Sequence, residues 1–212
     1  AAFIQQIDDQ LGFMEAFDPG YICNHSDHQG RYSFDNQPSI GLWNLNRLAQ
    51  SLTPLLSAEV LQQQLAEYER VLMAEYSRLM RAKLGLQHQE TANNDLLLGL
   101  LELMHHQGLD FTRTFRLLGE VRRETGPCRL HDEVLDRQAL DQWLQSYRQR
   151  LQRETTSDAQ RQAAMGRVNP KYILRNYLAQ MAIAAAEQDD PAPLARLHHC
   201  LQQPFAEQPE YE

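Results

Sequence analysis

The spacing of hydrophobic residues divides this chain into a polar, loop-rich stretch and a long helical array. Between Ser57 and Gly85, leucines and tyrosines recur every three or four residues, the spacing of one apolar stripe on an amphipathic helix. The run from Leu96 to Met104 is apolar nearly all round, so we expect its helix to lie in the core. Glycine, proline and capping residues mark helix ends, and the expected helical segments are 38–53, 57–85, 94–108, 110–126, 136–153, 157–166, 169–185 and 190–201.

Short polar residues that can cap a helix precede several of these segments. Asp110, Asp136 and Ser157 each stand before an apolar periodic run. Asn169-Pro170 has the form of a cap followed by proline at the first helical position. No strand pattern of useful length follows Phe34, so the sequence predicts a mostly α fold with at most a short hairpin before residue 36.

Residues 17–45 form the polar stretch and hold most of what is not helical. Asp18-Pro19-Gly20 is a turn signal, and residues 24–27 place four short hydrogen-bonding side chains in a row, which favours ordered irregular structure. Loops carry function more often than the scaffold that holds them. We expect the rings of Tyr32, Phe34 and Trp43 to be largely buried, and the polar side chains of Asn24, Asp27 and Asn36 to bond to backbone.

Composition is that of an ordinary water-soluble globule, with 42% hydrophobic residues and a mean hydropathy of −0.57. The 28 acidic residues exceed the 20 basic ones, which gives a formal charge of −8. Such a chain repels nucleic acid and anionic membrane, and it has no apolar run of 18 residues and no signal peptide. These features predict a cytoplasmic protein whose partners are neither nucleic acid nor membrane.

The cysteines and histidines offer little metal chemistry. Three cysteines stand far apart without CxxC spacing, which argues against a disulfide framework or a structural zinc site. Cys23, His25 and His28 are conceivable zinc ligands, but the sequence suggests no fourth ligand. The adjacent histidines at 105–106 and at 198–199 point about 100° apart on a helix, so neither pair chelates on one face.

At the loop, the sequence resembles a known family. NHSDHQGRYSFDNQP at 24–38, followed by WNLNRLA at 43–49, is similar to the selenoprotein O family, protein adenylyltransferases with a protein-kinase-like fold. The likeness continues through GFMEAFDP at 12–19, DFTRTFRLL at 110–118, NPKYILRNYLAQ at 169–180 and LQQPF at 201–205. It covers nearly all of the chain, and the order of its motifs makes it specific.

The resemblance implies an activity and its requirements. Members move AMP from ATP onto hydroxyl side chains of proteins, so ATP, magnesium and protein substrates are the implied cofactors and partners. It also implies that residues 1–56 end a kinase-like C-lobe, and that residues 57–212 form a helical C-terminal extension packed on it. In the family, the Gly-rich phosphate loop, the nucleotide lysine and the catalytic Asp-Asn pair lie upstream of the matched stretch, and none occurs in these 212 residues. We therefore expect this chain to be inactive alone and assign it no catalytic residue.

One metal ligand is implied by alignment. The family's metal-binding aspartate lies in a D-Y-G-P-x-G-F run, where this chain reads IDDQLGF at 7–13. An ungapped alignment places the aspartate on Ile7, whereas a deletion of one residue places it on Asp8. Asp8 is thus the metal candidate, and a solvated acidic stretch is the alternative.

Two interpretations of the loop residues stay open. The loop candidates, with a functional or a bracing role, are Asn24, His25, Ser26, Asp27, Arg31, Tyr32 and Asn36. The guanidinium groups of Arg31 and Arg175 either clamp a nucleotide or protein substrate, or tie the chain to a carboxylate such as Asp35 or Asp110. A second class of function also remains, an all-helical protein-binding module that uses the 17–38 loop as its contact surface.

Overall fold

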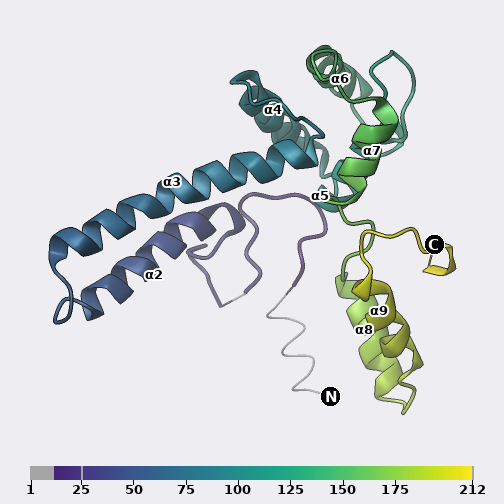
Figure 1. The fold of residues 1–212 in the computed structure, drawn as a ribbon. Helices are drawn as coiled ribbons and strands as arrows, with labels where there is room; N and C mark the ends of the chain where they lie inside the picture. The colour runs from purple at the N-terminus through teal and green to yellow at the C-terminus, as the bar shows by residue number, and fades with distance from the viewer. Residues whose placement is uncertain (1–11, 25, 212) are drawn as a thin grey trace. The chain divides into compact units, whose positions relative to one another are not determined.

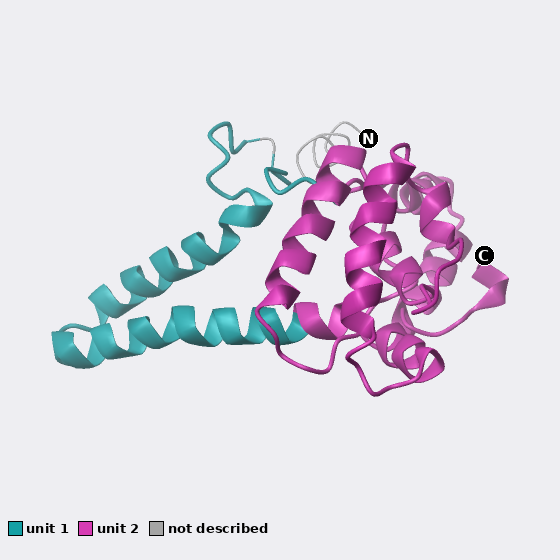
Figure 2. Ribbon diagram, turned by 90° about the horizontal axis from the view of Figure 1, so that it is seen from above, with its two compact units in different colours: residues 1–14, 18–79 teal, residues 15–17, 80–212 magenta. Residues whose placement is uncertain are grey.

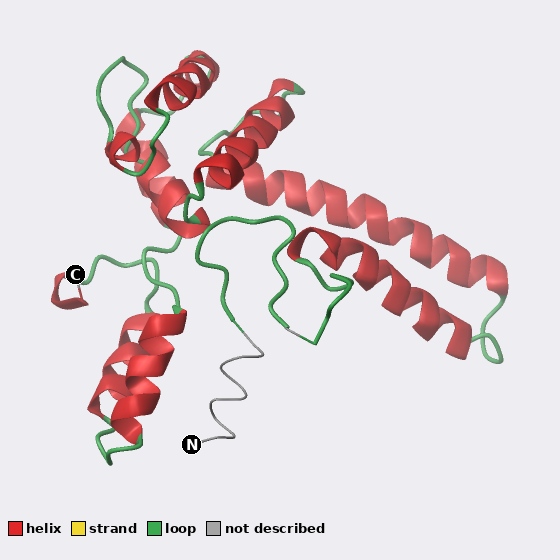
Figure 3. Cartoon of the chain, turned by 180° about the vertical axis from the view of Figure 1, so that it is seen from behind, coloured by secondary structure: helices red, strands yellow, loops and turns green. Residues whose placement is uncertain are grey.

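The computed structural model describes residues 12–24 and 26–211, and it is mostly α. Helix accounts for 61% of the described residues, and no strand occurs among them (Figure 3). The predicted mostly α fold is confirmed. Asp8 and His25 lie outside the described residues.

Helices follow one another along the chain with short connections (Figure 1). In order they are η1 (Phe34–Asn36), α2 (Gln37–Ser51), α3 (Ala58–Lys83), α4 (Ala92–Gln107), α5 (Phe111–Leu118), η2 (Arg129–Asp132), α6 (Arg137–Leu151), α7 (Asp158–Gly166), α8 (Asn176–Ala186), α9 (Ala192–Gln202) and η3 (Pro209–Tyr211). None of the described helices has the length and apolarity needed to cross a membrane.

Two compact units make up the chain (Figure 2). Their described parts are residues 12–14, 18–24 and 26–79 for the first unit, and residues 15–17 and 80–211 for the second, so the division falls inside α3. The predicted division after residue 56 stays a prediction.

In the first unit, α2 and α3 approach closely at Gly41. A Cβ on Gly41 would lie 2.4 Å from the hydroxyl of Tyr68, and that hydroxyl donates a hydrogen bond of 3.1 Å to the Pro38 carbonyl. No residue of α2 is buried. Exposed large hydrophobic side chains are frequent on the two helices, among them Trp43, Leu45, Leu48, Val60, Val71, Met73, Tyr76 and Leu79.

The second unit holds the main core, in which α4 contacts α6. Buried core side chains include Leu84, Leu96, Leu97, Leu100, Met104, Phe115, Leu118, Leu140, Trp143, Leu144, Tyr147, Leu151 and Met165. The Leu96 to Met104 run therefore supplies core residues as expected, although Leu98 is exposed. The indole of Trp143 donates to the Leu96 carbonyl at 2.9 Å and stacks on Tyr147 with ring centroids 5.0 Å apart.

A buried guanidinium joins several segments of this core. Arg161 on α7 is 2% exposed, and it donates to the Val121 carbonyl and, at 3.2 Å, to the hydroxyl of Tyr147. That hydroxyl donates in turn to the Leu84 carbonyl at 2.7 Å. Burial raises the pKa of Tyr147 to about 12, because the phenolate would lose its hydration. The phenol is thus held in its neutral, donating form.

A buried ion pair ties the segment between α3 and α4 to α6. Arg150 and Glu154 lie 2.7 Å apart, with side chains 3% and 0% exposed. The Glu154 carboxylate also accepts the backbone amides of Gln87 and His88, at 3.0 and 3.2 Å. Arg150 donates to the side chain of Asn93 and to the His88 carbonyl, both at 2.8 Å. These hydrogen bonds compensate the loss of hydration that makes buried charges costly.

Most predicted helix caps are confirmed. Asp110, Asp136 and Ser157 precede α5, α6 and α7, and each side chain accepts a backbone amide of the first turn. Gly85 and Gly108 follow α3 and α4 with φ of 69° and 63°, the left-handed conformation that glycine adopts at helix ends. The segment expected as one helix over 110–126 is shorter, because α5 ends at Leu118.

The helix predicted at Asn169-Pro170 is wrong in its start. α8 begins at Asn176 and packs against α9. Asn169 is fully buried, and its side-chain amide donates to the Lys83 carbonyl at 3.0 Å. The Asn169 side chain, which the sequence suggested as a helix cap, therefore bonds to a distant segment instead.

The described tail after Phe205, residues 206–211, is anchored to the rest of the second unit. Gln208 is 7% exposed, and its side chain donates to the carbonyls of Cys200 and Gln203 at 3.0 and 2.9 Å. Glu207 pairs with Lys171 and, at 2.6 Å, with Arg116. Lys171 and then Arg116 lower the pKa of the Glu207 carboxyl.

Candidate functional site

The loop of residues 18–37 is braced by its own polar side chains. The Asp27 carboxylate accepts the amides of Arg31 and Tyr32 at 3.0 and 2.7 Å. Asn24 accepts the amide of Ser26 at 2.9 Å, and Asn36 donates to the Arg31 carbonyl at 2.5 Å. The prediction that Asn24, Asp27 and Asn36 bond to backbone is confirmed.

Two backbone hydrogen bonds close the same loop. The amide of Phe34 donates to the Tyr21 carbonyl and that of Asp35 to the Pro19 carbonyl, both at 2.9 Å. Gly30 has φ of 67°, where a side chain would strain the turn. The described part of the loop therefore has a defined backbone shape.

The aromatic residues of this loop are not buried, contrary to the sequence prediction. Tyr32, Phe34 and Trp43 are 45%, 47% and 42% exposed. The guanidinium of Arg31 lies 4.5 Å from the ring centroid of Trp43 and 5.6 Å from that of Tyr32, and Arg47 lies 4.9 Å from Trp43. The rings of Tyr32 and Trp43 thus make cation–π contacts at the surface, where the sequence predicted burial among apolar side chains. Together Arg31, Tyr32 and Trp43 form an exposed cluster, here called the loop surface.

Arg175 has a bracing geometry. Its guanidinium pairs with Asp110, whose other oxygen caps α5 through the Arg113 amide at 2.8 Å. It also lies 3.4 Å from the Glu15 carboxylate, and that carboxylate accepts the Asn176 amide at 3.1 Å. Three chain segments, at 15, 110 and 175, are thereby fixed together. Arg31, in contrast, contacts rings rather than the carboxylate that the sequence suggested.

The described carboxylates do not fit a magnesium site. Magnesium takes oxygen ligands in near-octahedral geometry, whereas both oxygens of Asp27 accept backbone amides. No group of three or more His, Cys, Asp or Glu side chains among the described residues could hold a metal ion. Asp8, the candidate ligand, and His25, part of the conceivable zinc set, lie outside these residues.

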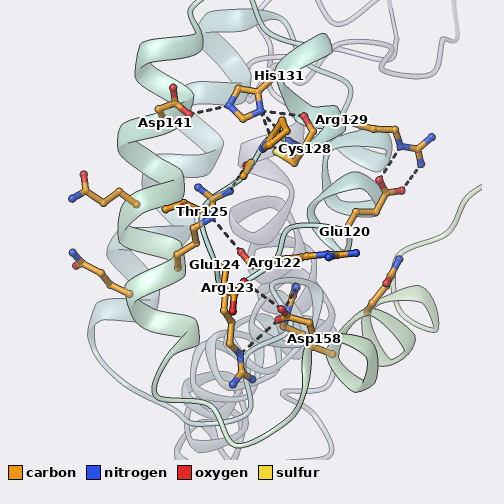
Figure 4. Close-up of a pocket in the computed structure, with 18 of the residues that line it drawn as sticks. Glu120, Arg122, Arg123, Glu124, Thr125, Cys128, Arg129, His131, Asp141 and Asp158 are labelled. Atoms are coloured by element: carbon orange, nitrogen blue, oxygen red, sulfur yellow. Dashed lines mark hydrogen bonds and ion pairs between the residues drawn. The ribbon is translucent and has the colours of Figure 1, made fainter.

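A wide cleft lies in the second unit, between the segment from Gly119 to Asp132 and helices α6 and α7 (Figure 4). It is open and has a volume of about 1800 Å³. Its wall is charged, with Arg122, Arg123, Arg129, Arg137, Arg148 and Arg161 facing Glu120, Glu124, Asp132, Asp141 and Asp158. The sequence predicted helix up to residue 126 in this segment and gave no sign of a cleft.

Hydrogen bonds within the cleft hold several of these charges in place. Arg129 donates to Glu120 at 2.8 Å, and Arg148 donates to the Gly126 carbonyl at 2.9 Å. On the α6 side, His131 lies between Cys128 and Asp141 (Figure 4). The Cys-x-x-His spacing at 128–131 was the only sequence signal for this arrangement.

Comparison with known proteins identifies the class to which this helical chain belongs. A family model described as Protein adenylyltransferase SelO matches residues 10–202. That range includes both the braced loop and the charged cleft. The chain therefore belongs to the protein adenylyltransferase SelO family, and the resemblance seen in its motifs is confirmed.

Particular relatives carry the name Protein nucleotidyltransferase YdiU. The protein of Yersinia pseudotuberculosis serotype O:1b (strain IP 31758) is 56% identical over 202 residues, which cover 95% of this chain and 42% of the relative. That of Pectobacterium carotovorum subsp. carotovorum (strain PC1) is 55% identical over 199 residues, covering 94% and 41%. That of Klebsiella pneumoniae (strain 342) is 53% identical over 196 residues, covering 92% and 41%. The chain thus spans less than half the length of these relatives.

Proposed function

We propose that this chain is the C-terminal part of a cytoplasmic protein adenylyltransferase, which moves AMP from ATP onto Ser, Thr or Tyr hydroxyls of other proteins. Residues 1–56 end a kinase-like C-lobe, and residues 57–212 form the helical extension. The observation that carries this proposal is the family match over residues 10–202. The chain supplies scaffold and a contact surface, and the chemistry depends on segments that it does not contain.

The residue content of the chain supports the assignment of the chemistry to other segments. Nucleotidyl transfer needs cations or backbone amides around the phosphates, a well-placed carboxylate for magnesium, and a group that accepts the hydroxyl proton. Residues 1–16 contain no lysine or arginine, and no Gly-rich phosphate loop occurs in the 212 residues. The described carboxylates do not fit magnesium either.

Calorimetry with Mg-ATP tests the proposal on the 212-residue chain. One or two carboxylates without a phosphate cradle give at most roughly millimolar binding, so we expect no resolvable heat at micromolar ATP. Incubation with labelled ATP should leave the chain unlabelled. The Yersinia relative, which carries the additional length, is the positive control for both assays.

Either of two results would contradict the proposal. Micromolar affinity for Mg-ATP would mean that the chain contains a phosphate site. Covalent label on the chain would mean that it contains the reacting groups. In both cases the candidates to reconsider are Arg31, Arg175 and residues 24–27.

A second candidate function is supported by the loop surface. Exposed Tyr32 and Trp43 beside the Arg31 guanidinium have the composition of a protein contact site, since aromatic residues and arginine are enriched there. In this alternative, the chain is an all-helical binding module without chemistry of its own. The gene sequence upstream of Gly12 decides between the two: a Gly-rich loop, a lysine and an Asp-Asn pair there support the transferase, and their absence supports the module.

A further inference from the structure

Three side chains at the charged cleft have the geometry of an activated thiol. The Sγ atom of Cys128 lies 3.3 Å from Nδ1 of His131, and Nε2 of His131 lies 2.9 Å from the carboxylate of Asp141 (Figure 4). Cys128 precedes η2, His131 lies within it, and Asp141 projects from α6. Thiol, imidazole and carboxylate are therefore aligned in the order nucleophile, base and orienting group.

Asp141 determines which nitrogen of His131 can act as the base. A carboxylate accepts only a donated proton, so the 2.9 Å contact places the imidazole hydrogen on Nε2. Nδ1 of the neutral ring then has its lone pair directed at the Cys128 amide, 3.3 Å away, and at the thiol. The Cys128 carbonyl, 3.1 Å from Nδ1, receives no proton in this tautomer.

Capping of a short helix does not explain the whole arrangement. Cys128 is the N-cap of η2, and the contact between its amide and Nδ1 belongs to that cap. The cap uses only one side of the imidazole, however. The other side is held by a residue ten positions later on a different helix, which a cap does not need. The second contact is the one that a general base requires.

We propose that Cys128 is a nucleophilic thiol site, with His131 as its base and Asp141 as a positioning residue, and that its co-reactant is a hydroperoxide. Hydrogen peroxide is small, polar and uncharged, so neither the guanidinium groups nor the carboxylates of the cleft repel it. The cleft opens to solvent and gives it access. This site is separate from adenylyl transfer and does not depend on the proposed function.

The reaction has a complete balance. His131 takes the proton of the thiol, and the Cys128 sulfur attacks one oxygen of the peroxide. An S–O bond forms as the O–O bond breaks, so the sulfur is oxidised by two electrons and the peroxide is reduced. The leaving hydroxide takes the proton back from His131 and departs as water. The product is Cys128 sulfenic acid, the first reversible step of thiol oxidation.

The surroundings of the thiol make the base necessary. Burial raises the pKa of Cys128, and this outweighs the lowering effects of the Leu130 and His131 amides and of the Arg148 charge. The thiol is therefore mostly protonated near neutral pH, although the thiolate is the reactive form. Removing the base should then slow the reaction more than it would for an exposed thiol.

Site-resolved mass spectrometry after brief treatment with iodoacetamide measures the reactivity of Cys128 in the folded chain. His131→Ala should slow alkylation of Cys128 by at least about tenfold, since a positioned base contributes that much or more. Asp141→Ala should slow it as well, and Asp141→Asn should restore most of the rate because its amide oxygen still accepts the Nε2 proton. Added imidazole should partly rescue His131→Ala. Hydrogen peroxide in place of iodoacetamide should oxidise Cys128 with the same ranking of variants.

Controls separate chemistry from folding. His106→Ala removes an exposed imidazole from α4 and should leave the rate unchanged. Buried Cys200 reports global unfolding by becoming alkylated, and Asp141 is 62% exposed, so its replacement should preserve the fold. The wild-type rate should show an imidazole ionisation in its pH profile that His131→Ala lacks. Equal rates for wild type, His131→Ala and Asp141→Ala, or an unchanged pH profile, would overturn the proposal and leave the cluster as a cap.

Discussion

The two tryptophans of the chain have opposite surroundings, and their replacement should show it. Trp143 is 8% exposed and donates to the Leu96 carbonyl, so Trp143→Ala should cost about 3–5 kcal/mol of unfolding free energy. Trp43 is 42% exposed and contacts two guanidinium groups, so Trp43→Ala should cost only about 1 kcal/mol. Urea melts of both variants compare them directly. A loss of 3 kcal/mol or more for Trp43→Ala would mean that its ring is covered in solution.

The sequence predicted a buried Trp43 from the spacing of apolar residues within one helix, and that spacing carries only local information. Ile40 and Trp43, and likewise Leu42, Leu45 and Leu48, recur at helical spacing, which correctly predicts the helix. Periodicity does not say whether a neighbouring element covers the apolar stripe. Trp143 has the same kind of spacing and is covered by α4. The difference lies in tertiary contacts that one helix does not specify.

The hydroxyl of Tyr147 makes two buried hydrogen bonds. Tyr147→Phe leaves the Leu84 carbonyl without its donor and removes an acceptor from Arg161. We expect a loss of about 1–3 kcal/mol, the cost of an unsatisfied buried polar group. Tyr177→Phe, at a residue 60% exposed, should change stability by less than about 0.5 kcal/mol. Chemical denaturation measures both, and equal losses would contradict the buried network.

The same hydroxyl predicts a pH dependence at the alkaline end. Its pKa rises from 10.0 to about 12 on folding, so above pH 10 the unfolded chain loses a proton that the folded chain keeps. Stability from this group is complete below pH 10 and falls as pH rises through 12, by on the order of 2–3 kcal/mol for a shift of two units. Tyr147→Phe should remove this component. An identical fall in wild type and variant between pH 10 and 12 would assign it to other groups.

At the scale of elements, the sequence predicts contacts between nearby residues better than it predicts contacts between distant segments. The caps at Asp110, Asp136 and Ser157 act within three residues, so the sequence alone predicts them. Asn169 looked like a cap but bonds to Lys83, 86 positions away. The bracing side chains of the loop were likewise predictable, because their hydrogen bonds span five residues or fewer. The charged cleft was not, since it joins segments that only the folded chain brings together.

The ends of α3 and α4 provide a matched test of glycine. Both Gly85 and Gly108 have positive φ, so alanine at either position strains the backbone by about 1 kcal/mol. At Gly85 a Cβ would also lie 2.5 Å from the Met165 sulfur and 2.8 Å from Arg161, whereas at Gly108 nothing lies within 4 Å. Gly85→Ala should therefore cost at least about 1 kcal/mol more than Gly108→Ala, since overpacking a core costs this much. Thermal and urea unfolding would contradict this if the two losses were the same.

At the scale of the whole chain, stability should differ between the two units. Helices α2 and α6 both have 15 residues, but α2 has no buried residue and α6 has six. Local opening is easiest where few apolar contacts must break. We expect backbone amides of α2 to exchange with deuterium at least about 100-fold faster than those of α6. Equal protection in the isolated chain would show that α2 is covered in solution, and dilution would then test whether a second copy covers it.

The anchored tail has a consequence for how the chain is made. Arg116 holds the carbonyls of Gly166 and Asn169 at 3.0 Å and the carboxylate of Glu207, which lies 91 positions later. On a ribosome adding about 5–20 residues per second, Glu207 joins the chain roughly 5 to 20 seconds after Arg116. During that interval the guanidinium of Arg116 on α5 lacks the Glu207 carboxylate. The emergence of residues 207 and 208 from the ribosome is therefore the event that completes the packing of this part of the protein.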